Sequence, residues 1–118
     1  MSVIFDHEKL DVYKVALEFC VWTYRIVRPL KGDFYDARAQ LVRAANSITL
    51  NIAEGCGRSS HAERRHFFQI STGSAFESAA VLDILQRTDN LSAALCDHGK
   101  ALLKRVVSML TRLTRAQH

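Results

Sequence analysis

The stretch that decides the fold is QLVRAANSITLNIAEGCGR, which runs from Gln40 to Arg58. Small and apolar side chains recur in it at three- and four-residue steps, and this spacing places them on one face of an α-helix. They are Leu41, Ala44, Ala45, Ile48 and Ile52. A polar seam recurs at the same steps beside this face, and it consists of Arg43, Ser47, Asn51, Glu54 and Arg58. Such a seam next to a small-residue face indicates that the helix packs against another helix or another subunit.

The helix that contains this stretch is predicted to begin near Asp33 or Asp36, whose carboxylates complement the dipole of the first turn. It is predicted to run to about Glu54. The next glycines, Gly55 and Gly57, are candidates for left-handed positions at its C-terminal end.

Three further helices are predicted around it. Asp6 is the candidate N-cap of the first, which should end at Arg28 because the ring of Pro29 disfavours helical geometry there. Ser60 and Glu63 have the capping-box spacing for the third helix. The turn signal Thr88-Asp89-Asn90 ends that helix. We expect Asn90 or Ser92 to cap the fourth, which is predicted to bury Leu95, Leu102, Leu103, Val106, Val107, Leu110 and Leu113.

These four segments predict an all-α fold. Each has roughly 20 residues or more, or about 30 Å of helix, and the connections between them are short. Short connections force consecutive helices to run antiparallel. We therefore predict one domain over residues 1–118, an up-down-up-down four-helix bundle.

Composition favours a soluble cytoplasmic protein. The chain has 118 residues with a formal net charge of +4, which is compatible with nucleic acid or an anionic surface without being diagnostic of either. Cys20, Cys56 and Cys96 are odd in number and widely separated, as is typical of a reducing compartment. The first five residues lack a secretion signal, and we expect no membrane span and no membrane partner.

The antiparallel arrangement predicts partners for the polar seam. Arg43 comes level with about Gly73 and within reach of Ser74 and Glu77, so Arg43 and Glu77 are a candidate ion pair. Glu54 is expected to pair with Arg58 or Arg65. The small residues at 73–75 would let the two helices approach closely. A half-buried Arg–Glu pair that loses one partner typically costs about 3–5 kcal/mol.

A structural role for the seam is favoured over a ligand-binding or catalytic one. The chain contains no nucleophile elbow, no phosphate-binding glycine loop and no H-E-x-x-H motif. His61 and His66 are five residues apart, which does not place two imidazoles on one helical face. We therefore predict no enzymatic activity, no metal site and no cofactor. The alternative, a small-molecule site, requires a pocket in which Arg43, Asn51 or Glu54 lacks protein partners.

The strongest charge asymmetry lies at the C-terminal end, where no acidic residue follows His98. Two interpretations are open for this segment. It is either a solvated helix face whose cations complement the dipole, or a stripe that contacts phosphates. The cations, which we call the basic face, are Lys100, Lys104, Arg105, Arg112 and Arg115. Arg25, Arg28 and Lys31 are candidates to extend it.

The central stretch resembles the signature of bacterial four-helix-bundle proteins related to the large-subunit rRNA intervening-sequence proteins. The resemblance covers nearly the whole chain, although the fourth helix matches only as an apolar pattern. It rests on 40–41, 43–45, 47–48, 51–55 and Arg58, on Leu10, Val12, Tyr13 and Ala16, and on Phe68, Ile70, Gly73, Ser74 and Glu77. Two positions depart from the family pattern: Val42 replaces a common second arginine, and Ala79 replaces a second acidic residue.

This resemblance implies a bundle that assembles into a ring-shaped homo-oligomer, with a pentamer favoured, and a possible role with RNA. We expect the basic face to provide any nucleic-acid contacts. Bundle and subunit packing is assigned to Arg43, Ser47, Asn51, Glu54, Gly55, Arg58, Ser74 and Glu77. Three functions stay open: an RNA-associated or nucleic-acid-binding oligomer, a protein-interaction scaffold that binds no nucleic acid, and a small-molecule-binding protein that uses the seam.

Overall fold

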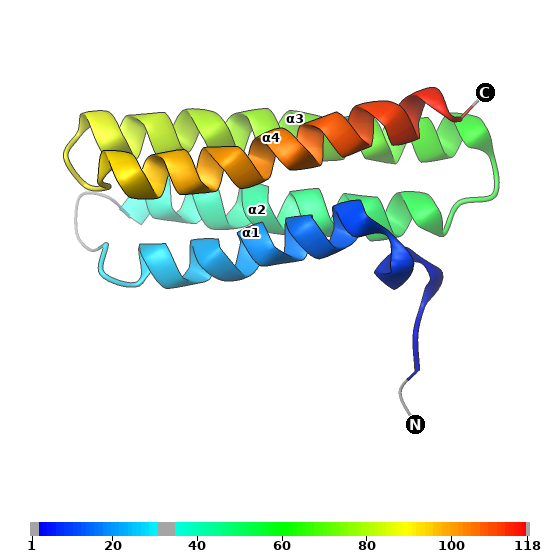
Figure 1. Ribbon diagram of the computed structural model, residues 1–118, viewed down its shortest axis with the longest axis horizontal. Helices are drawn as coiled ribbons and strands as arrows, with labels where there is room; N and C mark the ends of the chain where they lie inside the picture. The colour runs from blue at the N-terminus through cyan, green and yellow to red at the C-terminus, as the bar shows by residue number, and fades with distance from the viewer. Residues whose placement is uncertain (1–2, 31–34, 118) are drawn as a thin grey trace.

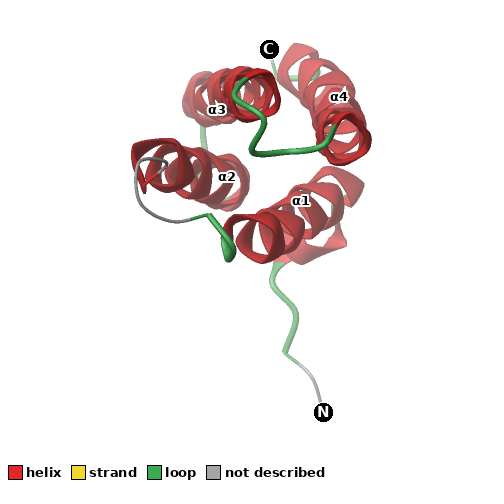
Figure 2. Ribbon diagram, turned by 90° about the vertical axis from the view of Figure 1, so that its left-hand side faces the viewer, coloured by secondary structure: helices red, strands yellow, loops and turns green. Residues whose placement is uncertain are grey.

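The protein is an all-α bundle of four long helices. The computed structural model describes residues 3–30 and 35–117, apart from the side chain of Tyr35. A short 3-10 helix, η1 (Asp6–Lys9), precedes α1 (Asp11–Val27), α2 (Tyr35–Cys56), α3 (His61–Arg87) and α4 (Ala93–Arg115). Consecutive helices run antiparallel (Figure 1), and an end-on view shows the four helices around a common centre (Figure 2). The predicted four-helix fold is confirmed.

The first helix begins later than the sequence predicts. Asp6 does not cap α1, because the backbone of Leu10 is extended and separates η1 from α1. Within η1, the Phe5 backbone N–H donates to the Glu8 carboxylate at 2.6 Å. The other end agrees with the prediction, because α1 ends at Val27, just before Pro29. The candidates Lys31 and Asp33 lie outside the described residues.

The end of α2 corrects the prediction for its two glycines. Neither Gly55 nor Gly57 has a left-handed backbone. The helix continues to Cys56, and Gly55 is buried inside it. A Cβ atom on Gly55 would lie 2.7 Å from the Phe68 ring, so the glycine is required there by the close approach of α3 rather than by backbone conformation.

The caps of α3 and α4 follow from the sequence. The Ser60 hydroxyl accepts a hydrogen bond from the Glu63 backbone N–H at 3.1 Å, which confirms the predicted N-cap of α3. The Ser92 hydroxyl accepts from the Leu95 N–H at 3.1 Å, so Ser92 rather than Asn90 caps α4. In the turn between these helices, Asp89 adopts a left-handed backbone with φ of 63°.

The core lies where the predicted apolar faces meet. Leu41, Ile48 and Ile52 are completely buried, and Ala44 and Ala45 are at most 2% exposed, as expected for the inner face of α2. Most of the apolar residues expected inside α4 are buried or half-buried. Leu95 is the exception at 42% exposure, because Cys96 and Gly99 take the inward positions in the first turns of α4. Among the described residues, no helix is long and apolar enough to cross a membrane.

Candidate functional site

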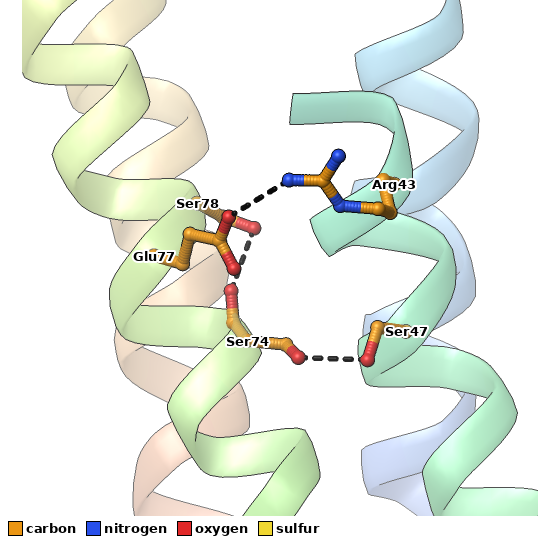
Figure 3. A network of polar contacts seen from close by, with 5 residues as sticks. All are labelled: Arg43, Ser47, Ser74, Glu77 and Ser78. Carbon is orange, nitrogen blue, oxygen red and sulfur yellow. Dashed lines mark hydrogen bonds and ion pairs between the residues drawn. The ribbon is translucent and has the colours of Figure 1, made fainter. Parts of the chain in front are cut away.

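The polar seam lies on α2 next to α3, and two contacts join the helices across it. The Ser74 hydroxyl donates to the Ser47 hydroxyl at 2.8 Å. One turn away, the Arg43 guanidinium lies 3.6 Å from the Glu77 carboxylate. Figure 3 shows both contacts side by side, with Arg43 and Ser47 on α2 facing Ser74 and Glu77 on α3. The predicted pairing of Arg43 with Glu77 is therefore confirmed.

The burial expected for this pair is wrong. The Arg43 side chain is 69% exposed and that of Glu77 is 47% exposed. Exposed ion pairs are screened by water and contribute about 0–1 kcal/mol, not the cost of a buried pair. Within a single chain, the seam is thus a surface feature. Its contribution to the stability of the bundle is correspondingly small.

The remaining seam residues find partners within α2 or in the turn that follows it. The Asn51 amide donates to the Ser47 carbonyl at 2.8 Å and to its hydroxyl at 3.0 Å. Glu54 pairs with Arg58, whose guanidinium also lies over the Phe67 ring, 4.9 Å from its centroid. Of the two partners proposed for Glu54, Arg58 is the correct one. Arg65 instead donates to the backbone carbonyl of Gln117 at 2.7 Å.

Below the seam, α3 contributes two buried serines that sequence reasoning did not single out. The Ser71 hydroxyl donates to the Ile48 carbonyl at 2.7 Å and so links α3 to α2. The Ser78 hydroxyl donates to the Ser74 carbonyl at 2.9 Å (Figure 3). With Ala75 these serines form a helical repeat of small residues, all at most 1% exposed. That spacing was the signal in the sequence for a close contact between α2 and α3.

The close approach does not use Gly73, contrary to expectation. In the part of the chain that the structure describes, a Cβ atom on Gly73 would meet nothing within 4 Å, because this residue faces outward from α3. The crowded glycines are Gly55, against Phe68, and Gly99, where a Cβ would lie 2.5 Å from the Trp22 ring. Helix contacts tight enough to require glycine therefore occur at the α2–α3 and α1–α4 interfaces.

A groove runs between α1 and α2, beside the seam. This α1/α2 groove has a volume of about 930 Å³, and its walls include Tyr24, Val27, Arg28, Val42, Leu50 and Asn51. The Asn46 amide donates to the Tyr24 hydroxyl at 2.9 Å and joins the two walls. Arg43, Asn51 and Glu54 each have a protein partner, so the condition set for a small-molecule site at the seam is not met.

The five cations of the basic face are all exposed on α4. Lys100 is bound to α3, because its ammonium group lies 2.8 Å from the Asp83 carboxylate. This hydrogen bond raises the pKa of Lys100. Among the described residues, no carboxylate lies within 4.0 Å of the other four, which are Lys104, Arg105, Arg112 and Arg115.

The surroundings of the basic face are mixed in charge. Lys104, Arg105 and Arg112 border a second groove, and its α1 wall carries Asp11 and Glu18. Arg25 lies farther along the same side of α1, close to His98 of α4, and can extend the face. Arg28 cannot, because it lines the α1/α2 groove. In the part of the chain that the structure describes, no group of three or more His, Cys, Asp or Glu side chains could hold a metal ion.

Comparison with known proteins agrees with this fold. A sequence profile described as 23S rRNA-intervening sequence protein matches residues 8–112. The chain is also similar to a crystal structure of a protein with unknown function from the S23 ribosomal protein family of Bacteroides thetaiotaomicron VPI-5482. That likeness has a TM-score of 0.80 at 23% identity, covers 87% of this chain and 97% of the other, and bears on the fold alone. A comparison with curated proteins finds no match.

Proposed function

Since this chain belongs to the 23S rRNA-intervening sequence protein family, we propose that it is a non-enzymatic, RNA-associated homo-oligomer of the cytoplasm. The RNA would be bound through the basic face of α4, and the copies would assemble into a ring, with five copies favoured. One observation carries the RNA contact: Lys104, Arg105, Arg112 and Arg115 are exposed on one helix, with no carboxylate within 4.0 Å among the described residues.

Phosphate groups are the chemistry that this surface fits best. Uncompensated cations attract the nucleic-acid backbone and release its bound counterions, and this term does not depend on sequence. The large exposed aromatic side chains of the described helices, Tyr24 and Phe76, lie on α1 and α3 rather than on α4. Base stacking is therefore not part of the proposal. A ring would present several basic faces to one RNA, which strengthens a weak contact through multivalency.

The test is binding of labelled structured RNA and of duplex DNA, each measured at low and at near-physiological salt. We expect affinity for RNA that falls steeply with salt. Arg112→Ala should weaken binding and reduce the salt dependence. Arg87→Ala is the matched control, because Arg87 is also an exposed arginine in the last turn of a helix, on α3 instead of α4.

The outcomes separate the candidate functions. Equal losses for Arg87→Ala and Arg112→Ala would mean that the general charge, and not the basic face, attracts RNA. No binding even at low salt would overturn the RNA proposal and leave a protein-interaction scaffold as the function. Preference for duplex DNA over RNA would assign the basic face to DNA.

A further inference from the structure

We propose that the N-terminal arm of one copy, Val3–Glu8, docks in the α1/α2 groove of the next copy. This inference rests on the homo-oligomer of the proposed function and goes further, because it names the two surfaces that join the copies. It is independent of RNA binding. Both surfaces belong to the described part of the chain.

The arm exposes three consecutive apolar side chains. Val3, Ile4 and Phe5 are 82%, 62% and 67% exposed, respectively. Figure 1 shows that the extended start of the arm, residues 3–5, points away from the helices, whereas η1 at its base lies against α1 and α2. An exposed run of this kind is an expected binding element, because moving apolar surface out of water is the main driving force of association. The described residues of this chain leave the run largely uncovered.

The groove offers a complementary surface. Val27, Val42 and Leu50 contribute apolar area, and Leu50 is 65% exposed, more than any other large apolar residue in the described helices. The groove also carries Arg28 and Arg43, while no carboxylate is among the described residues that line it. It thus combines an apolar floor with positive charge.

The arm and the groove are also complementary in charge. The arm contains two carboxylates, Asp6 and Glu8, and Lys9, the next residue along the chain, lies 3.9 Å from Asp6. An apolar segment with acidic residues at its base suits an apolar groove with arginines along its walls, since complementary charges fix the orientation of a docked segment. A second copy of this chain therefore supplies an occupant with the required chemistry.

The positions of the two surfaces predict how the copies are arranged. The base of the arm lies at the start of α1, whereas the groove includes Tyr24, Val27 and Arg28 from the last turns of α1. The arm and the groove are different surfaces near opposite ends of one helix. If each copy docks its arm in the next, the repeated heterologous contact produces a closed ring or an open filament, whereas reciprocal exchange between two copies produces a two-fold dimer. The proposed contact is compatible with a ring, and the oligomer mass from light scattering distinguishes a ring from a dimer.

The test is disulfide trapping between two differently tagged full-length chains, expressed together. One chain carries Phe5→Cys and the other carries Leu50→Cys, and diamide serves as the oxidant. We expect a cross-linked product that contains both tags. The matched control replaces Phe5→Cys with Phe76→Cys, because Phe76 is 62% exposed but lies on α3. The natural chain, with Cys20 and Cys96 buried and Cys56 partly buried, gives the background.

Light scattering on the natural chain distinguishes a failure of the docking inference from a failure of the proposed oligomer. An oligomer that gives no Phe5–Leu50 cross-link, or one no stronger than the Phe76 control, would overturn the docking inference and leave the oligomer in place. A monomer would overturn both. A link that forms in the Phe5→Cys/Leu50→Cys double variant, but never between differently tagged chains, would mean that the arm folds onto its own groove. That result also overturns the inference.

Discussion

Gly55 of α2 and the Phe68 ring of α3 are so close that a Cβ atom on the glycine would lie 2.7 Å from the ring. Phe68 is 2% exposed and belongs to the hydrophobic core, so a shift of its ring disturbs core packing. We expect Gly55→Ala to lower the free energy of unfolding by about 1–2 kcal/mol, since overpacking exceeds the gain in helix propensity. Thermal and urea denaturation would measure the change.

Gly73→Ala is the control for that substitution and a prediction of its own. Because a Cβ atom there meets none of the described residues within 4 Å, only helix propensity changes, and we expect a gain of about 0.5–1 kcal/mol. A destabilising Gly73→Ala would contradict the open surface seen here. If the loss grew with protein concentration, it would indicate that another subunit packs on this part of α3.

Thr23→Val should stabilise the bundle. The Thr23 side chain is completely buried, and its hydroxyl oxygen has no hydrogen-bond partner among the described residues. Valine has nearly the same shape and removes this desolvated group, so we expect a gain of about 1 kcal/mol in the free energy of unfolding. Ser71→Ala is the contrasting variant, because the Ser71 hydroxyl donates to the Ile48 carbonyl and its loss should destabilise. If both substitutions changed the free energy of unfolding by the same amount, the hydrogen bond of Ser71 would not explain a difference between the two buried hydroxyls.

The number of helices, the capping of α3 by Ser60 and the inner face of α2 could be predicted, because each depends on periodicity or on side chains within one turn. The antiparallel directions could be predicted because the connections are short. The Arg43–Glu77 pair also followed from register between antiparallel helices. Its exposure did not, since the depth of a pair depends on how the bundle closes around it. The close approach at Gly55 and the open surface at Gly73 were not predicted for the same reason: a glycine that prevents a clash cannot be distinguished in sequence from one that faces solvent.

Glu77→Ala tests the assignment of the seam to assembly. In a single chain the Arg43–Glu77 pair is exposed, so its loss should change the stability of the monomer by less than about 1 kcal/mol. If the seam packs against another subunit, the pair becomes desolvated, and the substitution should lower the oligomer mass or its melting temperature. Light scattering and thermal denaturation would be measured together. An unchanged mass and an unchanged melting temperature would remove Glu77 from the interface.

The Lys100–Asp83 pair predicts a pH dependence. The hydrogen bond to Asp83 raises the pKa of Lys100 above its ordinary value of 10.5. In the unfolded chain Lys100 has the ordinary pKa. The stabilisation by the pair is therefore fully present at pH values below that ordinary pKa, and it is lost as the pH rises through the higher pKa of the folded protein. NMR titration of the Lys100 side chain should show the raised pKa, and Asp83→Asn should lower it. Asp89→Asn, at the exposed turn, is the control and should leave it unchanged.

The same pair predicts that the basic face is not uniform in RNA binding. Lys100 already has a carboxylate partner at 2.8 Å, whereas Lys104 has none within 4.0 Å among the described residues. The Asp83 carboxylate already compensates the charge of Lys100, whereas a phosphate that approaches Lys104 meets an uncompensated cation. We expect Lys104→Ala to reduce the slope of log affinity against log salt by about 0.7–0.9, and Lys100→Ala to reduce it less.

Combining Lys100→Ala with Asp83→Asn should restore the net charge and leave the slope near that of the natural chain. If Lys100→Ala reduced the slope more than Lys104→Ala, the RNA would lie toward α3, and the unpaired cations would not be its main contacts.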